Sequence, residues 1–525
     1  IFERSTGGRR PGDRHVAGHG GLVVGSPGSR VVDRRDGDEV DLLDSSLRTG
    51  SGALLSTTLF VLTGIVYAFV TDPAATGRYF FAAIAIALLL RPVRGVSQAL
   101  QKVGSERGER VPAYFGLTLL FAVGYLLLMV VATLVGADFV TRTTAFDRAL
   151  LLPAALLAVS TTVSVVTDSL FGAVGYPSYQ AWLNAAQAAL RLGLLLVLNP
   201  FITTAGDVML VVAGTRGVTL LPVLVWLGER PQLPGRHEIE RTWGFARWSV
   251  PDQILDRFAF NMPTLVLGVV ASPAAVGVYE AADRFADLGA TISWRLSSPL
   301  LTRVSGDAAA GDETFAYLDA ATTGGTGVTF VLLGYLLGAH EAVAQLAFPS
   351  VQGVFSTTVL VVGGVNVFRG FWTLLSHALE GAGRPEFSFR TKLYGLICST
   401  PVTAVFGGQY GAVAGAVGYA LLNIVVFGLV AYYARGTFGR VPWDRPLTLR
   451  LTAGLGVAWA VTSGSTAGLA AVSAPATVVA VGGAAACLAG FVGFLAAVSP
   501  RTRHAAWRAY RLGRIRVGGA SRAGE

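Results

Sequence analysis

Long apolar runs recur from near residue 50 almost to residue 500, and they leave little room for any other kind of structure. A run of about 20 apolar residues is long enough to cross a bilayer as a helix. Hydrophobic residues make up 52% of the 525 and charged residues only 14%, which is too apolar for a water-soluble protein. The sequence therefore predicts an all-α membrane protein with about fourteen spans. We place them near 52–71, 79–100, 112–136, 149–171, 179–199, 206–227, 254–271, 275–300, 323–346, 353–379, 388–406, 411–433, 451–471 and 475–498.

The positive charge is concentrated in alternate connections between these runs. Arginine and lysine cluster in 101–111, 228–253, 380–392, 434–450 and the tail beyond 500. The opposite connections hold few, the exceptions being Arg78, Arg142 and Arg148. Positive charge marks the cytoplasmic side, so both termini are predicted to be cytoplasmic. The net charge of +9 then faces anionic lipid, and no nucleic-acid partner is expected.

Two short motifs occur twice and indicate an internal duplication. The stretch DPAATGRY at 72–79 returns as SPAAVGVY at 272–279, and GAVGYP at 172–177 returns as GAGRP at 381–385. Six spans therefore map onto six, with two spans left over. Because six is even, the copies share one orientation, related by an axis along the membrane normal, and such repeats are typical of secondary transporters.

The repeat and the charge pattern together predict the organisation of the chain. Residues 1–45, rich in Arg, Gly and Asp, are too polar to bury a core and are expected to be disordered. The remaining units are an N-terminal six-helix lobe at 46–230, a cytoplasmic linker at 231–252, a C-terminal six-helix lobe at 253–440, two additional helices at 441–500 and a basic cytoplasmic tail at 501–525.

The two repeated motifs and the six-plus-six-plus-two plan resemble the polysaccharide, or lipid-linked oligosaccharide, flippase family of the multidrug/oligosaccharidyl-lipid/polysaccharide exporter superfamily. YEAADRF at 279–285 and SSPL at 297–300 also look like this family's eighth span. The resemblance covers about residues 48–498. It implies a V of two lobes around a central cavity, and alternating access that carries a lipid-linked glycan from the cytoplasmic to the outer leaflet.

The eighth predicted span carries the densest set of charges within a span. Ionisable side chains at bilayer depth cost several kcal/mol unless they face a cavity or a partner. Their spacing of i, i+3, i+4, i+7 and i+15 indicates one helical face and a cavity wall. The set consists of Glu280, Asp283, Arg284, Asp287 and Arg295. Arg284 and Arg295 are predicted to bind a phosphate headgroup, because guanidinium is a permanently charged planar donor. Alternatively, the three carboxylates simply pair with Arg284.

Two more arginines extend the predicted phosphate site to both lobes. Arg94 follows Arg91 by three residues in span 2, and the 200-residue offset places it next to the equivalent of Arg295. Arg257, beside Asp256, lies near the start of span 7. The alternative is that these arginines only reach toward the cytoplasmic headgroups.

Other polar residues give weaker signals. Asp168 is a candidate for binding a coupling proton or sodium ion, and Asp256, Glu280, Asp283 and Asp287 are further candidates for ion coupling or a charge network. Three arginines are predicted to lie isolated in apolar surroundings: Arg191, Arg216 and Arg369. No catalytic constellation, metal cluster or cofactor motif is expected, since both cysteines lack partners at metal-binding spacing and neither lysine fits a P-loop.

Export of a lipid-linked oligosaccharide, carried on polyprenyl or dolichyl phosphate and supplied by partner glycosyltransferases, is the leading interpretation. A multidrug or cation antiporter of the same superfamily is the first alternative, but it would favour an acidic cavity. A polytopic glycan polymerase or ligase is the second, and such enzymes usually carry a large outward loop, for which no connection here is long enough. A major-facilitator transporter with fourteen spans is a further alternative, but the signature of that class lies in the loop between spans 2 and 3, where this chain has only Lys102–Arg110.

Overall fold

The computed structural model describes residues 42–498 except 105–109, 145–146, 175 and 311–316, and these residues form a bundle of helices. The helices are α1 (Leu42–Val70), α2 (Pro73–Leu89), α3 (Arg91–Gly104), α4 (Val111–Thr143), α5 (Leu151–Ala173), α6 (Pro177–Val197), α7 (Ala205–Leu227), α8 (Arg236–Val270), α9 (Pro273–Ala310), α10 (Leu318–Gly325), α11 (Gly327–Ala347), α12 (Gln352–Gly381), α13 (Pro385–Tyr410), α14 (Ala412–Phe438), α15 (Arg445–Ala471) and α16 (Ala476–Val498). The segment expected to be disordered, 1–45, lies outside the described residues up to residue 41, and its last four residues instead form the start of α1. The expected basic tail at 501–525 also lies outside the described residues.

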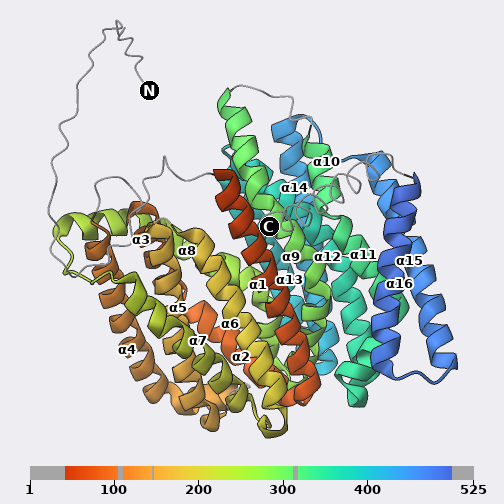
Figure 1. Cartoon of the computed structure of the whole chain (residues 1–525), viewed down its shortest axis with the longest axis horizontal. Coiled ribbons are helices and arrows are strands. Elements are labelled where there is room, and N and C mark those ends of the chain that lie inside the picture. Colours follow the sequence, from red (N-terminus) through yellow and green to blue (C-terminus); the bar gives the residue numbers. More distant parts are fainter. Residues whose placement is uncertain (1–41, 105–109, 145–146, 175, 311–316, 499–525) are drawn as a thin grey trace, which may run out of the picture.

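The all-α membrane class is confirmed. The helices run side by side, with α2–α7 on one side, α9–α14 on the other, and α15 and α16 at the far edge; α8 lies beside α3 and also packs on α13 (Figure 1). We call α1–α7 the N-terminal lobe and α8–α14 the C-terminal lobe. Within the described part of the chain, seven helical segments are apolar and long enough to cross a membrane alone, and an eighth counts if α2 and α3 form one span. Helix α1 contributes a shorter apolar segment, Leu55–Val70, and the remaining predicted spans coincide with helices that carry polar side chains within them, α8 and α9 above all.

The outside of the bundle is apolar, as a bilayer requires. Helix α4 shows this best, because Leu128, Leu134 and Val135 are 62%, 71% and 83% exposed. In water such a continuous apolar surface would be an aggregation or docking site. The additional helices α15 and α16 pack against α11, where Gly334 and Gly338 make room for Ala458 and Thr462.

The second predicted span is broken into two helices. α2 ends at Leu89, α3 begins at Arg91, and the two axes differ by 52°. Pro92 causes the break, because it has no N–H to donate to the carbonyl one turn back and its ring crowds that carbonyl. Arg91 and Arg94 therefore belong to α3, while the repeated hairpin motif belongs to α2.

Residues 236–252, predicted as part of a linker, form the first turns of α8. The carboxylate of Glu238 stabilises this start: it accepts hydrogen bonds from the Gly235 N–H at 2.9 Å and from Arg110 at 3.0 Å. Its own backbone N–H, Arg110 and the Gly235 N–H hold the pKa of this carboxyl below its ordinary value. Arg110 precedes α4, so Glu238 ties α8 to the N-terminal lobe.

We expect the thermal stability of the protein to fall as pH drops through the lowered pKa of Glu238. A carboxyl whose pKa is depressed in the folded state stabilises it fully above its unfolded pKa, and this contribution disappears on protonation. Glu238→Gln should lower the melting temperature at pH 7 and flatten its dependence on acid pH. Melting curves between pH 3 and 7 measure both effects; a variant with an unchanged pH profile would contradict the assignment.

Candidate functional site

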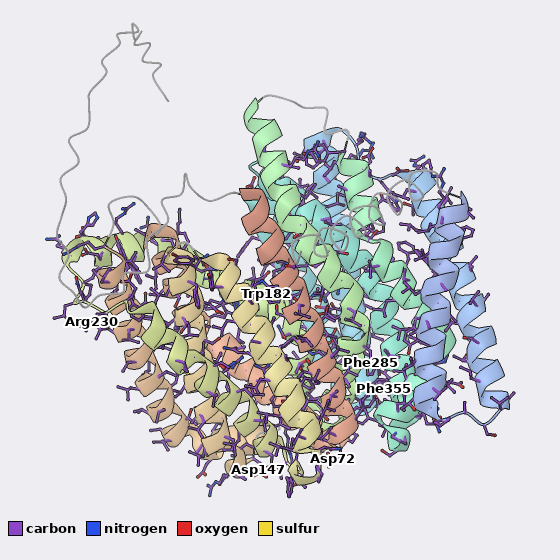
Figure 2. The ribbon with its side chains drawn as sticks, in the orientation of Figure 1. Asp72, Asp147, Trp182, Arg230, Phe285 and Phe355 are labelled. Carbon is purple, nitrogen blue, oxygen red and sulfur yellow. The ribbon has the colours of Figure 1, made fainter. Side chains whose placement is uncertain are left out.

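The two lobes meet closely at the end of the bundle that carries the repeated hairpin motifs. Asp72, which precedes α2, lies at this end (Figure 2). A Cβ atom added to Gly77 would lie 1.8 Å from the carbonyl oxygen of Pro273, and one added to Gly277 would lie 1.9 Å from that of Pro73. The duplicated motif thus builds a reciprocal contact of backbone on backbone between α2 and α9, which only glycine allows.

At the opposite end, α3 of the N-terminal lobe packs against α8 of the C-terminal lobe. The hydroxyl of Ser249 donates to the carbonyl of Gly95 at 3.2 Å, and Arg91 donates to the side chain of Gln253 at 2.8 Å. A Cβ on Gly95 would lie 2.4 Å from Val250. The lobes therefore touch at both ends of their interface.

Arg284 of α9 reaches from the C-terminal lobe into the N-terminal lobe. Its guanidinium lies over the rings of Phe60 and Phe80, 5.6 Å and 5.1 Å from their centroids, and Gly64 leaves room for its aliphatic stem. It donates to Glu280 at 3.0 Å, and Glu280 also accepts a hydrogen bond from Thr264 of α8. Of the three carboxylates predicted to pair with Arg284, Glu280 is the one that does.

The expectation that Arg369 is isolated is wrong. Arg369 of α12 forms an ion pair with Asp287 of α9 at 2.5 Å and donates to the Tyr419 hydroxyl at 3.0 Å. Thr291 and Asn366 extend this network within the C-terminal lobe. The sequence could not reveal the pair, because its members are 82 residues apart. Asp287 is therefore a structural partner of Arg369.

Arg94 and Arg257 lie across the lobe interface from each other. The charge of Arg257 interacts with those of Arg94, Arg284 and Glu280, and the charge of Arg91 interacts with those of Arg94 and Arg257. Arg94 is exposed and Arg257 half-buried. Among the described residues neither has a hydrogen-bonded or ion-paired side chain, whereas Asp256 is paired with Lys392 at 2.6 Å. Four arginines from α3, α8 and α9 thus gather at one place, which we call the interlobe arginines: Arg91, Arg94, Arg257 and Arg284.

The remaining predicted residues fall around this group. Asp283 is half-buried, and its charge interacts with those of Asp287, Glu280 and Arg284. The side chain of Arg295 lies outside the described residues, so its predicted contact with phosphate stays a prediction. Phe285 of α9 packs edge-on against Phe69 of α1 and Phe355 of α12 (Figure 2), so the residue that follows Arg284 also bridges the lobes.

Asp168 of α5 has neighbours that the sequence interpretation missed. Asn184 and Gln180 of α6 lie beside it, and its charge interacts with those of Arg94 and Arg216. The i, i+4 spacing of the two amides could have pointed to an inward-facing polar stripe on α6. Asp168 therefore links the interior of the N-terminal lobe to the interlobe arginines.

Because Arg284 and Glu280 pair closely, we expect their substitutions to be strongly non-additive. Arg284→Ala leaves the carboxylate of Glu280 without its ion-pair partner, although the Glu280 side chain is only 3% exposed. Removal of one partner from a buried ion pair costs about 3–5 kcal/mol, so this variant should be less abundant in the membrane. Adding Glu280→Gln should restore abundance at least in part. Quantitative immunoblots of membranes provide the test; equal losses in the single and double variants would rule out a structural pair.

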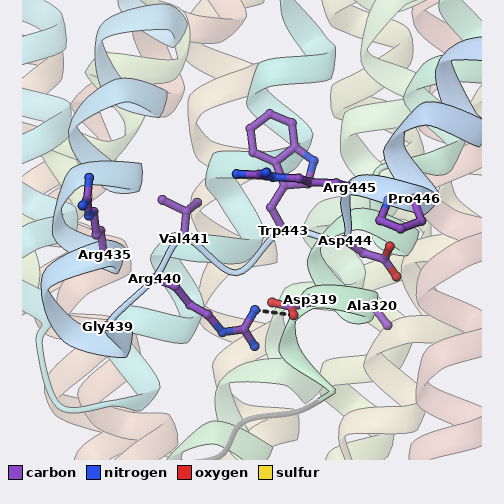
Figure 3. A pocket seen from close by; sticks show the side chains of 10 residues that line it. All are labelled: Asp319, Ala320, Arg435, Gly439, Arg440, Val441, Trp443, Asp444, Arg445 and Pro446. Atoms are coloured by element: carbon purple, nitrogen blue, oxygen red, sulfur yellow. Dashed lines mark hydrogen bonds and ion pairs between the residues drawn. The ribbon is translucent and has the colours of Figure 1, made fainter.

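A pocket of about 570 Å³ opens at the hairpin end between α2, α4, α8 and α9. It gathers the three arginines that were exceptions to the positive-inside pattern, Arg78, Arg142 and Arg148, with Asp147, which Figure 2 labels at the same end. A second pocket of about 860 Å³ lies where α10, α14 and α15 meet, and there Arg440 pairs with Asp319 (Figure 3). None of its lining residues belongs to the lobe interface. Within the described residues no cluster of His, Cys, Asp and Glu suited to a metal ion is found.

The comparisons with known proteins establish the fold. No protein-family model and no curated protein matches the chain. The lipid II flippase MurJ in its inward closed conformation superposes with a TM-score of 0.70 at 12% identity, over 86% of this chain and 98% of that one. An inward-facing multidrug resistance MATE transporter of the MOP superfamily superposes with a TM-score of 0.55 at 16% identity, over 75% of this chain and 94% of that one. A MOP superfamily transporter from Pyrococcus furiosus superposes with a TM-score of 0.53 at 15% identity, over 75% of this chain and 95% of that one. That transporter is described as having a binding pocket of reverse polarity, which suggests a different function.

Proposed function

We propose that this chain, which has the two-lobed fold of these transporters, moves a lipid-linked oligosaccharide or polysaccharide precursor across the cytoplasmic membrane by alternating access. The observation that carries the proposal is the gathering of interlobe arginines, of which Arg94 and Arg257 have no partner among the described residues. Guanidinium groups that face each other across an interface favour an anion between them, and their planar donor fork matches the geometry of phosphate. The phosphate of a lipid carrier would supply it.

The polarity of the interface argues against a carrier of cationic drugs. Such a substrate would need an excess of free carboxylates, but Glu280 is occupied by Arg284 and Asp256 by Lys392, which leaves, among the described residues, Asp168 and Asp283 against the unpaired Arg94 and Arg257. Asp168 and Asp283 form no ion pair in the part of the chain that the structure describes, and they are our candidates for binding a coupling proton or sodium ion. The similar structures described above are a lipid flippase and transporters, which favours transport without chemical change of the substrate.

The geometry suggests how access would alternate. Opening the α3–α8 end breaks the Arg91–Gln253 and Ser249–Gly95 hydrogen bonds and exposes the interlobe arginines to the cytoplasm. Once the headgroup phosphate lies between Arg94 and Arg257, the two like charges no longer repel, and this end can close again. Opening the hairpin end then separates Gly77 from Pro273 and releases the glycan outward, while the lipid tail stays in the bilayer. Both termini lie in the cytoplasm in this scheme, where glycosyltransferases would supply the substrate.

The proposal is tested with the purified full chain reconstituted into liposomes. We expect a polyprenyl-diphosphate-linked oligosaccharide to move to the opposite leaflet, measured with a lectin added outside, and a cationic dye not to be taken up. Liposomes with Gly77→Val protein serve as the control for leakage. Dye uptake without movement of the glycan lipid would support the antiporter alternative instead.

A further inference from the structure

One face of α6 carries a stripe of polar side chains into the interior of the N-terminal lobe. Gln180, Asn184, Gln187 and Arg191 follow at i, i+4, i+7 and i+11, which places them on the same side of the helix. The first two lie beside Asp168 of α5. The last two are more deeply buried, with exposures of 3% for Gln187 and 6% for Arg191.

The buried end of this stripe presents hydrogen-bond donors without acceptors. The Nε of Arg191, the Nε2 of Gln187 and the hydroxyl of Tyr67 on α1 are all buried and have no hydrogen-bond partner. Among the residues that the structure describes, Arg191 makes no ion pair either. A buried donor without a partner is destabilising, and a buried unpaired charge costs far more.

A second arginine lies beside the first. Arg216 of α7 donates one hydrogen bond to the Thr161 hydroxyl of α5, and its charge interacts with those of Arg191, Tyr67 and Tyr79. The ring centroids of Tyr67 and Tyr79 are 4.7 Å apart, so side chains from α1, α2, α6 and α7 converge around these two arginines. Two guanidinium groups in a low-dielectric interior repel each other strongly.

The carboxylate nearest to this pair does not neutralise it. The charge of Asp168 interacts with those of both Arg216 and Arg94, and its side chain forms no ion pair among the described residues. The interior of the N-terminal lobe therefore holds more positive than negative charge around Arg191 and Arg216, and Gln187 and Tyr67 add donors without a partner in the described part of the chain.

We propose that the N-terminal lobe binds a small inorganic anion of the chloride class between Arg191 and Arg216, with Gln187 and Tyr67 completing its coordination. These side chains suit an anion, because each guanidinium, the Gln187 amide and the Tyr67 hydroxyl can donate a hydrogen bond to it. Burial of Arg191 excludes a lipid headgroup or a glycan phosphate, whose tail or sugar must leave the site. The site is separate from the interlobe arginines, and its anion would stay bound while the transported phosphate comes and goes.

The first test measures thermal unfolding of the purified full chain in chloride against gluconate at constant ionic strength. A ligand that binds only the folded state stabilises it as its concentration rises above the dissociation constant. We expect the melting temperature to rise by about 2–5 °C between 1 and 100 mM chloride, and bromide to act likewise. Equal melting in chloride and gluconate would mean that water fills the site, and would overturn the proposal.

Gln187→Glu gives the sharper test, because it places a permanent carboxylate one helical turn from Arg191. This variant should melt in gluconate as the parent does in chloride, and should lose the chloride response. Gln352→Glu adds the same charge at the start of α12 and should leave the response intact. Retention of the full response in Gln187→Glu would contradict the assignment.

A crystal of the parent protein grown in bromide supplies a readout that does not depend on the folding of variants. Its anomalous difference map should show a peak between Arg191 and Arg216. Bromide peaks only at the surface would overturn the proposal, whatever the outcome of the transport assay.

Discussion

Gly77→Val and Gly277→Val should each abolish transport while leaving the protein in the membrane. The Cβ atom of either variant would lie within 2 Å of a carbonyl oxygen on the other lobe, and a backbone atom cannot move aside as a flexible side chain can. Closure of the hairpin end would be blocked. We expect glycan export to fall at least about tenfold, with Gly124→Val in α4, where no atom lies within 4 Å of the added Cβ, exporting as the parent does.

A second readout identifies the end that is blocked. Thr76 is 1% exposed in the closed arrangement, so a cysteine at this position should react with an impermeant maleimide added outside only when the hairpin end is open. Labelling of Thr76→Cys should therefore rise in the Gly277→Val background. Normal export by both glycine variants would show that this end does not need to close as the structure has it.

The largest effect on substrate recognition is expected from the double variant Arg94→Gln, Arg257→Gln. Each substitution removes a charge-assisted hydrogen bond to phosphate of about 1.5–3 kcal/mol, and the two together should reduce transport roughly a hundredfold or more. Lysine at both positions should restore only part of it, because an ammonium group cannot form the bidentate contact. Arg435→Gln, Arg445→Gln, which removes two arginines from the remote 860 Å³ pocket, is the matched control.

Membrane abundance must be measured beside transport in these variants. Neither Arg94 nor Arg257 is paired in the described part of the protein, so their loss should not reduce abundance and should, if anything, relieve repulsion. A double variant that is abundant and fully active would exclude these arginines from substrate binding. A double variant that is absent from the membrane would show that they are structural.

Hydropathy and the repeated motifs were enough to predict the long helices and the all-α membrane class. Spanning segments in a bilayer must be helical and of a set length to satisfy their backbone hydrogen bonds, which leaves few choices. The break at Leu90 was missed even though Pro92 signals it, because proline is tolerated within many membrane helices. The same reasoning gave no warning that α8 would continue outward to Arg236, where Glu238 accepts the Gly235 N–H.

Partners within the candidate site depended on contacts that spacing does not encode. Glu280 and Arg284 are one turn apart, and their pairing was foreseeable from i, i+4. Arg369 and Asp287 come from different helices, as do Arg94 and Arg257, and only the packing of α9 on α12 and of α3 on α8 shows which are paired and which are free. The polar stripe on α6 lay within reach of the sequence, but its amides were overlooked beside the charged residues.

The most direct test of the account is a structure of the protein determined with a polyprenyl-diphosphate-linked oligosaccharide bound. We predict phosphate density between Arg94 of α3 and Arg257 of α8, within hydrogen-bond distance of at least one guanidinium from each lobe. Headgroup density confined to the lipid-facing surface, with Arg94 and Arg257 still unpaired across the interface, would contradict it.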